Sequence, residues 1–108
     1  MAQRKIIWSH RASVKLLSIL EFYTERNKSK DYAKKLHQKF NKELQILLKQ
    51  PNLGLRTEME TVRGLIVDEF ILFYEFDKDH IIIHTVWDCR QKPDDQLYYL
   101  VPSARPVS

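Results

Sequence analysis

The sequence has little of the residues that crosslink or interrupt a chain. Its single cysteine, Cys89, rules out a disulfide within the chain, and nothing in the composition requires an oxidising compartment. Two glycines and four prolines leave little room for linkers. No apolar run approaches the roughly 20 residues that span a bilayer, and residues 1–8 lack the apolar stretch of a secretory signal. We therefore expect a cytoplasmic protein that has no membrane partner.

Motifs for metal-dependent or nucleotide-hydrolysing chemistry are also missing from the sequence. The histidines at positions 10, 37, 80 and 84 show no paired ligand spacing, and one cysteine cannot form a cluster. The sequence contains no glycine-rich phosphate loop, nucleophile elbow or zinc-protease helix. We expect neither a metal nor a cofactor.

The charge that is present is distributed unevenly. Residues 1–50 contain 12 lysines and arginines against 4 acidic residues, a net charge of +8, whereas residues 51–108 contain 6 against 10, a net charge of −4. A basic half suggests an acidic or polyanionic partner. The simpler alternative is that these lysines solvate the outer face of a helix.

The basic half predicts one strand and two helices. Residues 5–8 are β-branched and aromatic, which is typical of a strand, and Ser9 can cap the helix that follows. Apolar residues then recur at helical spacing in two stretches, and the short link between them makes the two helices antiparallel neighbours. The expected elements are a strand at Lys5–Trp8, a helix from His10 to about Arg26, and a second helix from Ser29 or Asp31 up to Pro51.

In the acidic half the apolar residues recur with a period of two, which is typical of strands. Three runs, Val62–Val67, Phe70–Phe76 and Ile81–Trp87, are joined by short turns and predict an antiparallel meander. We expect an α+β fold of order β-α-α-β-β-β, with the helical hairpin on one face of a small, mostly antiparallel four-stranded sheet and the other face open. The domain is expected at residues 1–97 and a C-terminal tail at 98–108.

Several polar side chains could act together beside this sheet. Metal-free cleavage of RNA needs a base, cations on the phosphate and an acid for the leaving oxygen. Arg63 and Arg90 suit the phosphate, and His84 or Tyr98 could handle protons. The structural alternative is that His84 is a packed strand residue and Arg90 pairs with a nearby aspartate. Whether the chain is an enzyme stays open at this point.

The order and spacing of several segments resemble the RelE/ParE superfamily, the toxins of type II toxin–antitoxin systems, which include plasmid stabilisation proteins. The matching segments are Ile6–Ser9, Leu47–Pro51 with Gly54, Val62–Val67, Ile71–Tyr74 and Val86–Gln91. The resemblance extends to about Leu97 and implies the same fold. It also implies a cognate antitoxin that neutralises the toxin, and binding of operator DNA only through the antitoxin complex.

The superfamily has two branches with different activities, and the residue at one sequence position helps to distinguish them. RelE-like members cut mRNA on the ribosome, whereas ParE-like members poison DNA gyrase. The nucleases typically carry arginine just before the Leu-Val-Tyr of the third strand, and the matching residue here is Ile71. Loss of one preorganised charge at such a site costs on the order of a hundredfold in rate.

The resemblance therefore implies a ParE-like growth inhibitor that binds its target, DNA gyrase. Two alternatives stay open. One is a RelE-like endoribonuclease that acts on ribosome-bound mRNA through Arg63, Arg90, His84 and Tyr98. The other is an inactive relic that retains antitoxin binding.

The resemblance also directs attention to the basic helices. An acidic, amphipathic antitoxin segment is expected to fold against these helices and an exposed sheet edge. We expect Lys35, Lys39 and Lys42 on the second helix to contact it.

Overall fold

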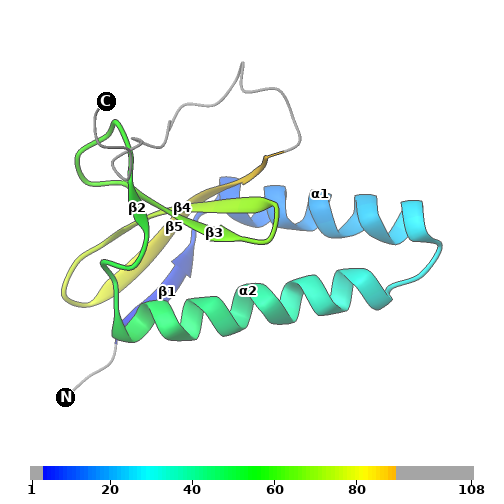
Figure 1. Cartoon of the computed structure of the whole chain (residues 1–108), viewed down its shortest axis with the longest axis horizontal. Coiled ribbons are helices and arrows are strands. Elements are labelled where there is room, and N and C mark those ends of the chain that lie inside the picture. Colours follow the sequence, from blue (N-terminus) through cyan, green and yellow to red (C-terminus); the bar gives the residue numbers. More distant parts are fainter. Residues whose placement is uncertain (1–3, 90–108) are drawn as a thin grey trace.

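The computed structural model describes residues 4–89, which form two helices beside one sheet (Figure 1). No helix in this part of the chain is long and apolar enough to cross a bilayer. The elements are β1 (Lys5–Trp8), α1 (His10–Asn27), α2 (Asp31–Lys49), β2 (Leu55–Arg56), β3 (Arg63–Val67), β4 (Phe70–Phe76) and β5 (His80–Asp88). The predicted elements are all present, and their bounds differ from the expected ones by one or two residues.

Side chains at the helix ends explain where α1 begins and where α2 starts. The Ser9 hydroxyl accepts a hydrogen bond from the Ala12 amide at 3.0 Å, which satisfies one of the free N–H groups of the first turn. Lys28 ends α1 in the left-handed conformation with φ 54°. The Ser29 hydroxyl then accepts from the Asp31 amide at 3.1 Å. The predicted Ser9 cap is confirmed.

The sheet has five strands rather than four, in the order β1-β5-β4-β3-β2. Strand β1 is parallel to β5, and the other neighbours are antiparallel. The strand count was wrong because β2, which pairs with β3, contains only Leu55 and Arg56. Two residues carry no alternating pattern, so no strand could be predicted there.

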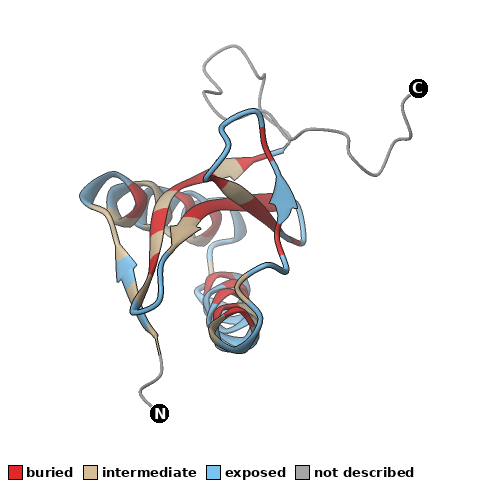
Figure 2. Ribbon diagram, turned by 90° about the vertical axis from the view of Figure 1, so that its left-hand side faces the viewer, coloured by how far each residue is buried: buried red, intermediate tan, exposed pale blue. Residues whose placement is uncertain are grey.

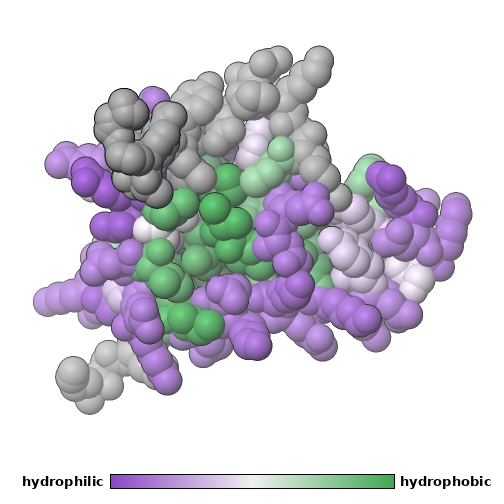
Figure 3. Space-filling view, in the orientation of Figure 1, coloured by the Kyte–Doolittle hydropathy of each residue, from purple (hydrophilic) through white to green (hydrophobic). Residues whose placement is uncertain are grey.

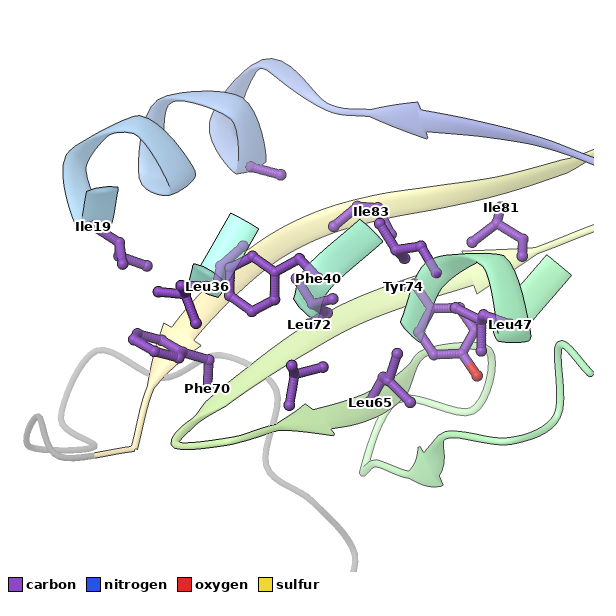
Figure 4. Packing of buried hydrophobic residues seen from close by; sticks show 14 of the residues in the cluster. Ile19, Leu36, Phe40, Leu47, Leu65, Phe70, Leu72, Tyr74, Ile81 and Ile83 are labelled. Atoms are coloured by element: carbon purple, nitrogen blue, oxygen red, sulfur yellow. The ribbon is translucent and has the colours of Figure 1, made fainter. Parts of the chain in front are cut away.

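The main core lies between the helices and one face of the sheet, as predicted. In Figure 2 the buried residues of α2 lie on its side toward the sheet and the exposed residues lie on its far side. Phe40 of α2 packs edge to face on Phe70 of β4, with 5.7 Å between the ring centroids. Figure 4 shows the apolar side chains of both layers directed into the space between them.

The opposite face, here called the outer face, is not open at its centre, and that part of the prediction was wrong. Ile71 and Phe73 are buried there and form a second, smaller cluster with Val62. Trp87 packs against this cluster and is partly buried. Val62 precedes β3, so the loop before that strand helps to cover the outer face.

A β-bulge in β5 decides which residues reach each face. Phe73 pairs with Thr85 and Tyr74 pairs with Ile83, so His84 is the additional residue of the bulge. The alternation along β5 therefore shifts by one residue, and Val86 joins Ile83 in the main core.

Tyr74 joins the centre of the sheet to the chain that leaves α2. Its fully buried hydroxyl donates to the Pro51 carbonyl at 2.7 Å and accepts from the Gly54 amide at 2.9 Å. A Cβ at Gly54 would lie 2.6 Å from that hydroxyl oxygen. The pKa of Tyr74 is raised, and burial of the phenol is the largest cause. The hydroxyl therefore stays a neutral donor at physiological pH.

We expect Tyr74→Phe to lower the free energy of unfolding by about 1–3 kcal/mol, because it leaves a buried N–H and a carbonyl without partners. Urea denaturation measures this difference. Tyr32→Phe is the control, since that side chain is partly exposed on α2, and it is expected to change stability by less than about 0.5 kcal/mol. Equal stability of Tyr74→Phe and the wild type would contradict this role.

The turn between β4 and β5 is held by the carboxylate of Asp77. One of its oxygens accepts from the amides of Asp79 and His80, each at 2.7 Å. These hydrogen bonds lower the pKa of Asp77 below its ordinary value of 3.8, and the bond from the Asp79 amide has the largest effect. Its stabilising effect is therefore fully present above the ordinary value and is lost as the pH falls through the lower, folded-state value.

Asp77→Ala is expected to lower the thermal midpoint at neutral pH, and the difference from wild type should shrink as the pH falls below about 3.8. Thermal unfolding across a pH series measures it. Asp77→Asn is the control, because an amide oxygen accepts the same bonds without titrating. A difference for Asp77→Ala that is constant with pH would contradict the assignment.

Candidate functional site

The two candidate nuclease residues within the described part of the chain lie on opposite faces of the sheet. Arg63 pairs across the strands with Tyr74, whose ring lies in the main core, so Arg63 is on the helix side. Nε2 of His84 lies 2.8 Å from the carboxylate of Glu75, the residue after Tyr74, which places His84 on the outer face. The structure therefore does not bring Arg63 and His84 together.

Arg63 acts structurally where it lies. Its Nη1 donates to the Gly54 carbonyl at 2.9 Å and to the Asn52 carbonyl at 3.3 Å, on the same loop that Tyr74 holds. Both side chains thus tie the chain after α2 to the sheet.

His84 is half-buried at the β-bulge beside Glu75, so it is neither a core residue nor free in a cleft. The carbonyl of His84 also accepts from the Ser9 hydroxyl at 3.0 Å, which joins the bulge to the start of α1. Arg90 and Tyr98, the other members of the predicted set, lie outside the described residues, as does the tail at 98–108.

Cys89 is exposed, and its surroundings disfavour the thiolate. The pKa of its thiol is raised, chiefly by partial desolvation and to a smaller extent by the nearby carboxylates of Asp88 and Glu69. A thiol attacks as the thiolate, so a raised pKa lowers its reactivity at neutral pH. Among residues 4–89, no group of three histidine, cysteine, aspartate or glutamate side chains could hold a metal ion.

The three lysines predicted to bind an antitoxin are all exposed on α2 but differ in their surroundings. Lys39 forms an ion pair with Asp68, with its Nζ 2.9 and 3.0 Å from the two carboxylate oxygens. Asp68 lies in the turn between β3 and β4 with φ 55°. Lys35 and Lys42 follow each other at a spacing of seven residues along the exposed side of α2, where Figure 3 shows hydrophilic side chains along the lower edge of the molecule.

A pocket of about 330 Å³ lies along α1 at the end of β5, and sequence reasoning missed it. We call it the α1 pocket; its lining residues are Lys15, Ser18, Ile19, Phe22, Tyr23, Arg26 and Asp88. The Phe22 side chain is 54% exposed, although it stands edge to face against the Tyr23 ring at 4.9 Å. The Tyr23 hydroxyl donates to the Asp88 carboxylate at 3.5 Å. The available signal was Phe22 itself, a large apolar residue outside the buried stripe of α1.

Comparison with known proteins agrees with this architecture. The sequence model of the family described as "ParE toxin of type II toxin-antitoxin system, parDE" matches residues 6–93, which is most of the chain. The chain belongs to this family. A solved structure described as the chromosomal ParDE TA system from P. aeruginosa matches with a TM-score of 0.67 and 20% identity, covering 80% of this chain and 96% of that one. No curated protein matches. This ParE-family toxin thus has the fold that the resemblance implied.

Proposed function

We propose that this ParE-family toxin inhibits growth by binding DNA gyrase in the cytoplasm, and that a cognate antitoxin neutralises it. The observation that carries the proposal is the place of Ile71. The position where RelE-like nucleases typically carry arginine is here an isoleucine, 6% exposed, within the apolar cluster of the outer face. A cation that would stabilise a phosphate is therefore replaced by a packed side chain.

The arrangement of the remaining polar groups supports the same choice. Arg63 is engaged with backbone carbonyls on the helix side, while His84 is paired with Glu75 on the outer face. Acid–base catalysis requires its groups within hydrogen-bonding reach of one substrate. Binding to a protein target requires only a complementary surface, so a ParE-like binder needs no such constellation.

The basic exposed side of α2 supports an acidic partner. Lys35 and Lys42 are exposed, and their charge would attract an acidic antitoxin segment before contact. Lys39 is less available, because its ammonium group already pairs with Asp68. We further propose that operator DNA is bound through the antitoxin complex and not by this chain alone.

Induction of the toxin in cells is expected to stop growth and to trap gyrase on cleaved DNA, while the 5′ ends of transcripts stay unchanged. Mapping of covalent gyrase–DNA complexes and of transcript ends in the same cultures measures both. Codon-phased cuts without trapped gyrase would contradict the proposal and favour the ribosome-dependent nuclease. Unimpaired growth combined with tight antitoxin binding would identify an inactive relic.

Reversal of two charges, Lys35→Glu with Lys42→Glu, is expected to slow association with the antitoxin about tenfold at low salt and to leave the dissociation rate nearly unchanged. Stopped-flow or biosensor kinetics measure the two rates. Lys78→Glu, on the exposed turn between β4 and β5, is the matched control. An unchanged association rate at low salt would show that these lysines are only solvated.

A further inference from the structure

We propose that the α1 pocket is the anchoring site for an acidic, amphipathic segment of the antitoxin. This inference rests on the proposed antitoxin partner and names the place that holds it. The lysines of α2 would attract the partner, whereas the α1 pocket would retain it.

The shape of the α1 pocket fits a peptide segment better than a small molecule. Its two cationic residues, Lys15 and Arg26, are eleven positions apart on α1, so their backbone positions are about 16 Å apart along the helix axis. About eleven helical residues or five extended residues span that distance.

The lining between the two cations is apolar and aromatic. Ile19 and Tyr23 are buried at the base, and the Phe22 ring stands half-exposed beside them. An exposed aromatic ring next to a hollow is the kind of feature on which binding energy concentrates when a partner covers it. A leucine or aromatic side chain of the partner would fill this middle section.

The charge of the surrounding surface selects an acidic partner. Arg11 lies one turn before Lys15 on the same side of α1 as Phe22 and Arg26, so three cations flank the apolar section. The acidic residues of the helix, Glu21 and Glu25, lie about a quarter turn away around the axis.

The charges of Asp88 and Lys15 at the α1 pocket indicate where the carboxylates of the partner would bind. Asp88 is buried against the Tyr23 hydroxyl, so it would repel an acid that entered the pocket floor. The Lys15 ammonium lies 6.0 Å from the centre of the Trp87 ring, at one end of the pocket. The acids of the partner are therefore expected to pair with Lys15 and Arg26 at the two ends, with the apolar residue between them.

The test uses the full-length toxin and the purified product of the reading frame that adjoins its gene. We expect Phe22→Ala and Arg26→Glu each to accelerate dissociation by at least roughly 30-fold, the first through loss of the central apolar contact and the second through loss of an ion pair at the end of the pocket. Phe22→Ala keeps the charge of the surface, so its association rate is expected to change much less. Thermal unfolding of each variant checks the fold. Arg26→Glu alters an exposed side chain, so it keeps the test valid if Phe22→Ala is destabilised.

The matched control is Ile66→Ala. Ile66 is 50% exposed, close to the 54% of Phe22, but it lies on β3 away from the α1 pocket, so its replacement is expected to leave both rates unchanged. If the wild type binds the adjoining product while folded Arg26→Glu dissociates less than about threefold faster, the pocket assignment is overturned and the proposed function stands. If the wild type does not bind that product, the antitoxin proposal and this inference both fail.

Discussion

The hydrogen bonds of the buried Tyr74 hydroxyl fix the relation between the helical layer and the sheet. One group on the central strand β4 holds both Pro51 and Gly54, and Arg63 holds the same loop from β3. The end of α2 is thereby set against the sheet, and its apolar stripe faces the core. The opposite side of α2, with Lys35 and Lys42, must then face solvent. The hydrogen bonds of Tyr74 and Arg63 to this loop therefore determine which side of α2 a partner can reach.

The β-bulge at His84 has an equally direct effect on function. It turns Trp87 to the outer face and brings Asp88 beside Tyr23 of α1. His84 and Arg63 reach opposite sides of the sheet. The two candidate nuclease residues of the described chain therefore do not share one cleft, which agrees with the proposed action by binding.

The sequence predicted the features that depend on local periodicity. The apolar spacing of α2 and the Ser9 cap identified the helices, and alternation identified three of the strands. Features that depend on pairs distant in sequence were not predictable. The Lys39–Asp68 ion pair joins residues 29 positions apart, and the need for glycine at position 54 comes from the Tyr74 hydroxyl 20 positions away. The exposed Phe22 of α1 was a sequence signal for the α1 pocket, but its other wall, at the end of β5, comes from a residue far away in the sequence.

The most direct test of target binding is co-sedimentation of the purified toxin with each candidate target, without antitoxin. Binding through a surface requires a stable contact with the target itself, whereas a ribosome-dependent nuclease must occupy the ribosome. We predict that the toxin sediments with DNA gyrase and does not sediment with ribosomes. Sedimentation with ribosomes and not with gyrase would contradict the account.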